Sequence, residues 1–262
     1  MLKNYFKEIE LNAYKENQMK IREIIENEAK SLSSSLLDVG CGGCSFTEDF
    51  LKMGFNVYGM EINEELIRTG REKGVKVKKG DANKKFPFKD KYFDIVVCNQ
   101  VIEHLYNPDN AFEEIRRVLK NDGIAIISVP NLCSLHNRIF TLIGWQNTTI
   151  VPSTKYVFGN PNRGTPSMHD GLCRHLTGFS PKALKEMTEF YGFKIEKLYG
   201  RGFHPFNTHV SNLLSSIFPT LSVYLILKLG KIKRKKYYIN FKLDKKVFDV
   251  YDFQNKKLLN NR

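Results

Sequence analysis

The chain has 262 residues, 42% of them hydrophobic and 12% aromatic, and 41 Lys and Arg against 28 Asp and Glu give a formal net charge of +13. This length and composition favour one main soluble globular domain, and no apolar run reaches the roughly 18 residues that a membrane-spanning helix needs. The charged N-terminus is unlike a signal peptide, so a cytoplasmic location is expected, and the positive charge favours an anionic partner such as nucleic acid, phospholipid or a phosphorylated substrate.

The first thirty residues predict a helix, with Met19, Ile21, Ile24 and Ile25 on one face at helical spacing. From residue 36 to residue 130, short apolar runs then alternate with amphipathic segments. This alternation of strands and helices predicts an α/β fold with a doubly wound parallel sheet and helices on both faces, because right-handed crossovers restrict the topology.

The regular alternation stops after residue 130, and we expect residues 131–175 to form a lid insertion over a substrate. Helical spacing resumes with Ser180 as the N-cap, and Gly192 suits the end of that helix. Two last strands with a short helix between them complete a domain over residues 1–230. Residues 231–262 form a basic C-terminal extension that includes a possible hairpin.

A Cys-x-x-Cys pair, Cys41 and Cys44, lies inside the stretch LLDVGCGGCSF at residues 36–46. Two interpretations compete. A structural metal site needs about two more ligands, and no second closely spaced Cys or His pair supplies them. Alternatively, a strand ends in a glycine-rich turn that opens a helix, where the backbone approaches a ligand closely and free N–H groups point at it. The five cysteines are odd in number and well spread, which indicates reduced thiols.

Carboxylates follow the next two predicted strands in the order that a nucleoside-binding site requires. Glu61 ends the second strand, about 20 residues after the glycine-rich turn, where ribose hydroxyls are held in this architecture. Asp81 follows the third strand, and the fourth strand ends near Asn99. A dinucleotide is disfavoured because Ser45 replaces the third glycine of G-x-G-x-x-G, while Asp38 suits a ligand that carries an ammonium group.

With these segments in this order, the chain resembles the class I S-adenosylmethionine-dependent methyltransferases over roughly residues 15–230. It is most similar to the branch that includes ubiquinone-biosynthesis O-methyltransferases and many sugar- or glycan-modifying enzymes. The resemblance implies a Rossmann-like, seven-stranded, mostly parallel sheet and S-adenosyl-L-methionine as cofactor, with S-adenosyl-L-homocysteine as product. The matching segments are LLDVGCGG (36–43), VYGMEIN (57–63), GDANKKFPFKDKYFDIVVCNQVIEHL (80–105) and RRVLKNDGIAIISVPN (116–131).

The same resemblance assigns cofactor contacts around the methionine portion, the ribose, the adenine and the pocket at the fourth strand. In that order, the residues are Asp38, Gly40, Cys41 and Gly42; Glu61 and Ile62; Asp81 and Ala82; and Asn99 and Gln100. One departure is Cys44, which stands where the family often has a third glycine, so helix and strand are expected slightly further apart.

Methyl transfer to a hydroxyl requires a base that removes its proton, and histidine suits that role near neutral pH. His175 and His169 are the candidate catalytic residues, because the resemblance places a histidine in the acceptor region there. His104 is expected to be structural or to line the pocket. His136, His204 and His209 are expected on the surface or in loops.

The acceptor is expected to be a small molecule, a sugar or glycan, or a lipid-linked compound, methylated at oxygen, and no metal is expected. The segment RIFTLIGWQ (138–146) holds the only Trp and fits either a helix packed over the pocket or a surface that touches lipid. Residues 228–236 add a basic run suited to anionic membrane. An RNA methyltransferase and a catalytically silent cofactor-binding scaffold stay open as alternatives.

Overall fold

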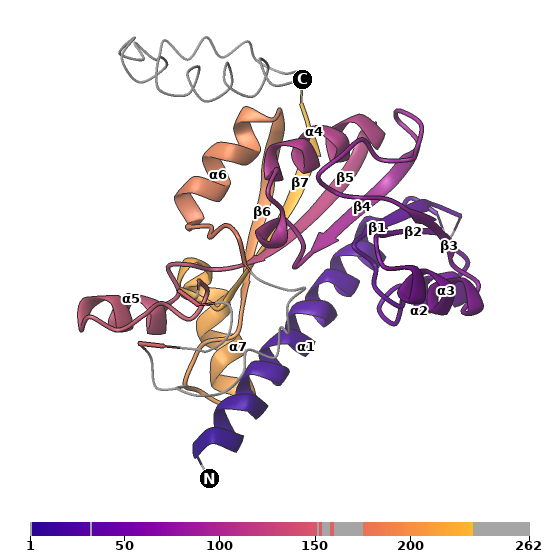
Figure 1. Ribbon diagram of the computed structural model, residues 1–262. Helices are drawn as coiled ribbons and strands as arrows, with labels where there is room; N and C mark the ends of the chain where they lie inside the picture. The colour runs from indigo at the N-terminus through magenta and orange to yellow at the C-terminus, as the bar shows by residue number, and fades with distance from the viewer. Residues whose placement is uncertain (1, 32, 151, 154–157, 160–174, 233–262) are drawn as a thin grey trace, which may run out of the picture.

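A computed structural model describes residues 2–31, 33–150, 152–153, 158–159 and 175–232, with side chains from Glu8 onward. A seven-stranded sheet in the order β3-β2-β1-β4-β5-β7-β6 forms its centre (Figure 1). The strands are β1 (Ser35–Val39), β2 (Asn56–Glu61), β3 (Lys76–Lys79), β4 (Phe93–Asn99), β5 (Leu119–Pro130), β6 (Phe193–Arg201) and β7 (Tyr224–Lys231).

Strands β1 to β5 pair in parallel, and β7 runs antiparallel to both of its neighbours, β5 and β6. The predicted doubly wound, mostly parallel, seven-stranded sheet is therefore confirmed. The described α-helices are α1 (Leu2–Glu28), α2 (Glu48–Lys52), α3 (Glu64–Glu72), α4 (Pro108–Val118), α5 (Leu135–Leu142), α6 (Pro181–Phe190) and α7 (Thr208–Ile217).

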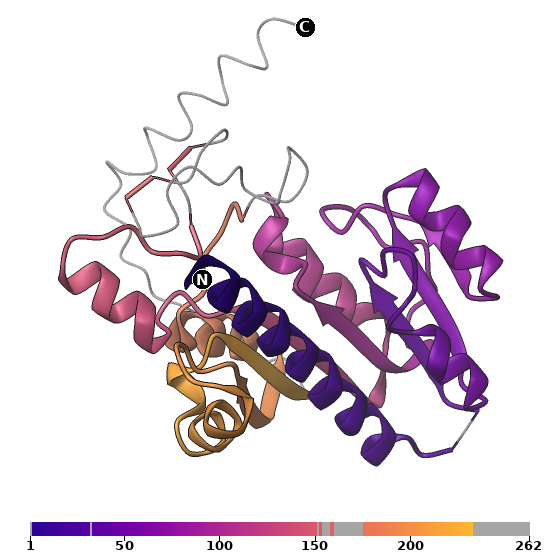
Figure 2. The same ribbon diagram turned by 90° about the horizontal axis from the view of Figure 1, so that it is seen from below.

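The central strands are apolar on both faces, which is why two separate cores form. Leu36 of β1 packs in one core with Ile21 and Ile25 of α1, while its neighbour Leu37 packs in the other core with Phe112 of α4. Successive side chains of a strand point to opposite faces, so a continuous apolar run covers both. Helices α1, α2 and α3 cover one face of the sheet, and α4 and α6 cover the other (Figure 2).

Helix α1 corrects one prediction. Ile21, Ile24 and Ile25 are buried as expected, but Met19 is 61% exposed. At 100° per residue, Met19 lies about 160° from Ile21, because residues two apart do not share a helix face. The buried stripe instead continues through Asn17, a polar residue that the apolar pattern did not include.

The two windings of the sheet diverge between β1 and β4, so the carboxyl ends of these strands flank the usual ligand-binding crevice of such folds. Helix α5 follows directly on β5 at this same edge. A lid role for residues 131–175, like the domain boundary at residue 230, stays a prediction, and the possible hairpin lies outside the described residues. Within the described part of the chain, no helix is long and apolar enough to cross a bilayer.

Candidate cofactor and acceptor site

The glycine-rich turn after β1 presents an open surface. Gly40 and Gly42 both have positive φ, 72° and 52°, which favours glycine. A Cβ on Gly40 would lie 2.5 Å from a methyl of Val101, whereas a Cβ on Gly42 would have no neighbour within 4 Å. The turn therefore packs tightly on one side and leaves room for a ligand at Gly42.

The two cysteines of this turn are packed side chains. A Cβ on Gly70 of α3 would lie 2.7 Å from Cys44 Sγ, and a Cβ on Gly59 of β2 would lie 2.5 Å from Cys41 Sγ. Facing glycines thus make room for both thiols, which accounts for how Cys44 fits where a third glycine was expected. Both cysteines are free, and neither belongs to a group of three potential metal ligands among the described residues.

Two carboxylates face the turn. Asp38 is buried, and this burial, together with the nearby Cys44 thiol and Glu61, raises the pKa of Asp38 well above its usual range. Glu61 accepts hydrogen bonds from the backbone N–H of Gly42 at 3.0 Å and of Ile62 at 2.8 Å. Because burial and the neighbouring Glu61 disfavour the charged form of Asp38, a ligand with a positive group beside it would be favoured here.

The loop after β3 joins this site through the backbone. The N–H of Gly80 donates to the carbonyl oxygen of Glu61 at 3.0 Å, which places Asp81 beside the end of β2. Despite partial burial, hydrogen bonds from Asn83 lower the pKa of Asp81. The Ala82 carbonyl accepts from Asn110 at 3.0 Å. The predicted adenine contacts are therefore held in a fixed loop next to Glu61.

A buried polar network fixes the end of β4. Asn17 of α1 donates to Asn99 Oδ1 at 2.8 Å and accepts from the Ser128 hydroxyl at 2.8 Å. Gln100 Nε2 donates to the same hydroxyl at 3.1 Å, and Gln100 has a positive φ of 56°. The fully buried Asn17 thus connects α1 to two strands at the carboxyl edge.

Glu103, His104 and His175 form a cluster beside this network. One potential ligand atom of each lies within 4.8 Å of those of the others, an arrangement that could also hold a metal ion. The Glu103 side chain is 1% exposed, and neither of its carboxylate oxygens has a hydrogen-bond partner among the described residues. Burial raises the pKa of Glu103 to about 8. His175 Nδ1 lies 2.6 Å from the Thr149 carbonyl oxygen.

Tyr14 of α1 lies within electrostatic range of both the cluster and the carboxyl group at the glycine-rich turn. Burial and the negative charges of Asp38 and Glu103 all raise the pKa of Tyr14. Its ring also contacts the ring of Tyr224 edge to face, with centroids 6.3 Å apart. The Tyr14 phenol therefore interacts electrostatically with the carboxyl group at the turn and with the carboxyl group of the cluster.

The other histidines lie apart from this cluster or outside the described residues. His169 belongs to the residues that the structure does not describe. The rings of His136 and His204 lie with their centroids 5.0 Å apart, and both residues are half-buried. His204 lies in a loop, as expected, whereas His136 belongs to α5. Burial lowers the pKa of His136 to about 3 and that of His204 to about 4. His209 is exposed as expected.

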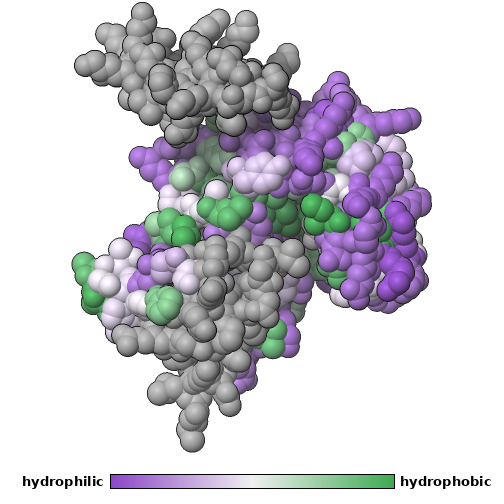
Figure 3. Space-filling model, in the orientation of Figure 1, coloured by the Kyte–Doolittle hydropathy of each residue, from purple (hydrophilic) through white to green (hydrophobic). Residues whose placement is uncertain are grey.

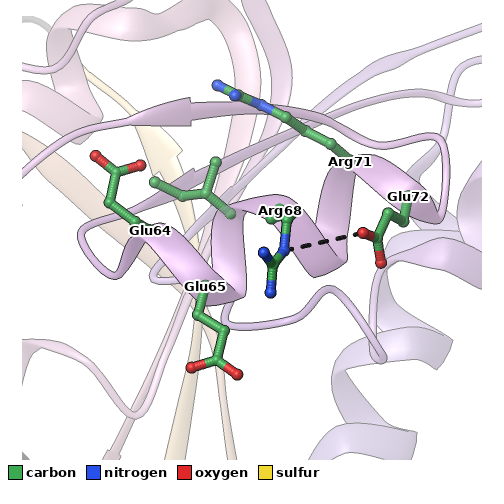
Figure 4. A pocket seen from close by; sticks show the side chains of 6 residues that line it. Glu64, Glu65, Arg68, Arg71 and Glu72 are labelled. Atoms are coloured by element: carbon green, nitrogen blue, oxygen red, sulfur yellow. Dashed lines mark ion pairs between the residues drawn. The ribbon is translucent and has the colours of Figure 1, made fainter.

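A separate hollow on the outer face of α3 is a charged surface feature. Figure 4 shows that acidic and basic side chains from this one helix line it, with an Arg68–Glu72 ion pair at 4.0 Å. Arg71 is also engaged, because its guanidinium donates to the Val77 carbonyl. This hollow lacks the glycine-rich turn and the buried carboxylates that mark the site at the strand ends.

Asn17, Tyr14 and Glu103 were missed by the sequence analysis. The two α1 residues reach the site from more than 80 positions away along the chain, as the bond to Asn99 shows, and no local pattern reports such a contact. Glu103 had a usable signal, because an acidic residue inside the apolar run VIEHL just after a buried strand requires a reason to be there.

The sequence and the fold both match known methyltransferases. A family model described as a methyltransferase domain matches residues 37–127, which run from within β1 into β5. The chain therefore contains a class I S-adenosylmethionine-dependent methyltransferase domain. The expected family, enzyme class and cofactor are thereby confirmed.

Two relatives and one solved structure show how similar the methyltransferase is to individual proteins. It is 28% identical to an uncharacterized protein of Methanocaldococcus jannaschii over 236 residues, 85% of this chain and 86% of that protein. It is 29% identical to ubiquinone biosynthesis O-methyltransferase of Rickettsia bellii over 169 residues, 63% of each, so it spans less than two thirds of that relative. A crystal structure of a SAM-dependent methyltransferase from Methanosarcina mazei shares the fold, with a TM-score of 0.56 and 19% identity over 80% of this chain and 98% of that one.

The described residues of the methyltransferase fit S-adenosylmethionine. The open side of Gly42 leaves space for the methionine portion, and Asp38 offers a buried carboxyl group whose charged form an adjacent ammonium group would stabilise. Glu61 Oε2 accepts from the Gly42 N–H alone and so retains acceptor capacity for a ribose hydroxyl, whereas Oε1 already accepts from the N–H groups of Ile62 and Asn63. The roles of these single residues stay predictions.

Proposed function

We propose that this methyltransferase transfers a methyl group to a hydroxyl oxygen of a small-molecule, sugar or lipid-linked acceptor, with His175 as the base that receives the hydroxyl proton. The cofactor supplies a methyl group on a sulfonium, which is already a good leaving group. The chain must therefore orient the acceptor and remove one proton.

The observation that carries this proposal is the hydrogen bond between His175 and Thr149. A carbonyl oxygen can only accept, so the Nδ1 of His175 must carry the hydrogen of this 2.6 Å contact. In the neutral ring, Nε2 is then the nitrogen that carries the lone pair. The bond thus selects the tautomer that a base needs and orients the ring at the same time.

Glu103 complements this base. A carboxyl group with a pKa of about 8 is mostly protonated at neutral pH, so it can donate a hydrogen bond to an acceptor oxygen. Because its oxygens have no hydrogen-bond partner among the described residues, a bound hydroxyl or alkoxide would supply the hydrogen bond that this buried group lacks. We assign Glu103 the role of positioning the acceptor oxygen.

The name of one relative supports oxygen as the atom that is methylated. The Rickettsia bellii relative is named as an O-methyltransferase, and it matches this chain over 63% of its length. The alternatives, RNA methylation and a silent scaffold, require different behaviour. RNA binding would fall steeply with salt, and a scaffold would bind the cofactor without any transfer.

The test uses methyl-labelled S-adenosylmethionine with the full chain and fractionated cell extract. We expect label in a small-molecule, glycan or lipid fraction, in a bond stable to mild base as an ether is. Label in RNA would support the RNA alternative. Cofactor binding by calorimetry without label in any fraction would support the scaffold and overturn the proposal.

A further inference from the structure

Helix α5 buries a polar side chain and exposes apolar ones. Its buried side chain is the polar Asn137, which is 1% exposed and donates to Thr149 Oγ1 at 3.0 Å while accepting from the Thr148 N–H at 2.9 Å. Its apolar Leu142 is 86% exposed, and Ile139 and the C-capping Ile143 are also exposed. Ordinary surface helices show the opposite arrangement, so this outward apolar face requires an explanation.

Helix α7 repeats this inversion nearby. Ser211 and Ser215 are its buried residues, whereas Leu213 and Ile217 are exposed by 62% and 57%. The ring contact between His136, at the start of α5, and His204, just before α7, joins the two segments. Two neighbouring helices therefore bury polar side chains and expose apolar ones, so the apolar surface extends over this end of the molecule.

The same two regions lack charge. Residues 139–154 and 202–227 contain no Asp, Glu, Lys or Arg, although 26% of the chain is charged. Side chains without charge can leave water without the large desolvation cost of an ion. A surface that combines exposed apolar side chains with missing charges is thus suited to an apolar environment.

We propose that the outer end of α5 inserts into the interfacial layer of an anionic lipid bilayer. We call this surface, made of Ile139, Leu142, Ile143 and Trp145, the α5 tip. Its first three residues share one helix face at positions i, i+3 and i+4, and Trp145, 45% exposed, follows directly. Indole rings favour the membrane interface.

The shape and charge of the molecule favour a bilayer as the occupant. Both ribbon views show α5 projecting from the body, and hydrophobic side chains gather at its outer end (Figures 1, 2 and 3). A projecting apolar tip suits insertion to the 5–10 Å depth typical of interfacial helices. The net charge of +13 attracts anionic lipid, and the exposed Arg138 lies one turn before Leu142. Nucleic acid would need several cations at the contact itself, which the tip does not have.

The basic run predicted for membrane contact, residues 228–236, differs from this surface. Lys228 belongs to β7 and pairs with Glu28 and Glu196, and Lys231 donates to the Leu119 carbonyl. These two lysines therefore support the fold. Residues 233–236 lie outside the described part of the chain, so the contribution of that run stays a prediction.

The α5 tip is also connected to the candidate acceptor site. Asn137 holds Thr149 by its hydroxyl, and the Thr149 carbonyl holds His175. Docking of α5 would hence bring the His175 side of the site toward the lipid surface. The docking proposal itself does not depend on which atom is methylated.

The single Trp of the chain makes the proposal directly testable. We would add vesicles of phosphatidylcholine with one quarter phosphatidylglycerol to the full chain and record Trp145 fluorescence. We expect emission at shorter wavelength and quenching by brominated lipid. An unchanged spectrum with vesicles that bind the protein would overturn the proposal, because the protein would then bind by another surface.

Flotation of the same vesicles measures how much the α5 tip contributes. Burying a leucine side chain changes affinity on the order of tenfold or more, so Leu142→Ser should weaken vesicle binding by about that factor. Met19→Ser is the matched control, because Met19 is an exposed apolar residue outside α5 and α7, and it should change binding less than twofold. Equal binding by Leu142→Ser, or a spectral shift that depends on protein concentration without lipid, would refute lipid insertion, the latter in favour of a second copy of the chain.

Discussion

His175 and Thr149 are joined by a 2.6 Å hydrogen bond that fixes which nitrogen of the imidazole carries hydrogen. Replacing His175 with Asn removes the Nε2 lone pair, so we expect methyl transfer to fall by roughly 10²–10⁴-fold, the usual contribution of a general base. Cofactor affinity should stay within twofold of the natural chain. Labelled transfer and calorimetry measure the two quantities.

His209→Asn is the control for this change, since His209 is exposed. Full activity of His175→Asn would remove the base assignment. Loss of transfer on treatment with a chelator, with recovery on adding a divalent cation, would instead identify Glu103, His104 and His175 as a metal site, which their spacing also allows.

Glu61 should control cofactor binding. Its carboxylate accepts from backbone N–H groups at Gly42 and Ile62, and hydrogen bonds to a charged group contribute about 1.5–3 kcal/mol. Glu61→Gln should therefore weaken S-adenosylmethionine binding about tenfold or more in a calorimetric titration. Glu65→Gln, an exposed change on α3, should leave the affinity unchanged. Equal affinities for the two variants would show that Glu61 does not hold the ribose.

Glu103 should make stability depend on pH. Below pH 4.5 the carboxyl is protonated in both the folded and the unfolded chain; between pH 4.5 and its folded pKa of about 8, only the unfolded chain releases the proton. The Glu103 contribution to the free energy of unfolding should thus fall by up to about 1.4 kcal/mol per pH unit across this window. Urea unfolding from pH 5 to pH 8 measures the slope. Glu103→Gln should flatten it and Glu65→Gln should not; a slope that survives Glu103→Gln would contradict the prediction.

Asn17 should be important for stability despite its distance from the turn. Asn17→Ala removes the donor to Asn99 Oδ1 and the acceptor for the Ser128 hydroxyl hydrogen, and each buried group left unsatisfied costs about 1–3 kcal/mol. We expect a loss of that order in urea unfolding, whereas Lys15→Ala, an exposed change on the same helix, should cost less than about 0.5 kcal/mol. Equal stability of the two variants would mean that the network does not hold α1 in place.

Replacing Gly70 with alanine should change the stability of the chain in the direction opposite to the usual one for a helix. Alanine normally stabilises a helix by about 1 kcal/mol relative to glycine, but here its Cβ would lie 2.7 Å from Cys44 Sγ. Gly70→Ala should therefore destabilise the chain by about 1–3 kcal/mol. Adding Cys44→Gly should recover part of this loss, and part only, because Val77 also lies within 2.8 Å. A stabilising Gly70→Ala would show that the two positions do not crowd each other.

Local patterns were sufficient for much of the fold. The alternation from Leu36 to Pro130 predicted the parallel strands because each strand is apolar on both faces, and Ser180 does accept from the Ala183 N–H at 3.1 Å as a helix cap should. The glycine-rich turn and Glu61 were found for the same reason, since both are short motifs with a fixed order along the chain.

Other features could not be read from local patterns. The contact between Asn17 and Ser128 spans 111 positions, so no sequence pattern near Asn17 indicates that its side chain is buried. For helix α5, the sequence does not indicate which way its apolar face points. Hydrophobic spacing identifies which residues share a face, but it cannot say whether that face meets the protein core, and the packed alternative for residues 138–146 was wrong for Leu142.

The position of β7 also has a consequence for synthesis. This strand is the last described one in the chain, yet it lies between β5 and β6. While the polypeptide leaves the ribosome, β6 has no neighbouring strand until Tyr224–Lys231 has emerged, and an unpaired strand edge invites association with other chains. Translation that stalls before residue 224 should accordingly yield an aggregation-prone nascent chain that relies on chaperones.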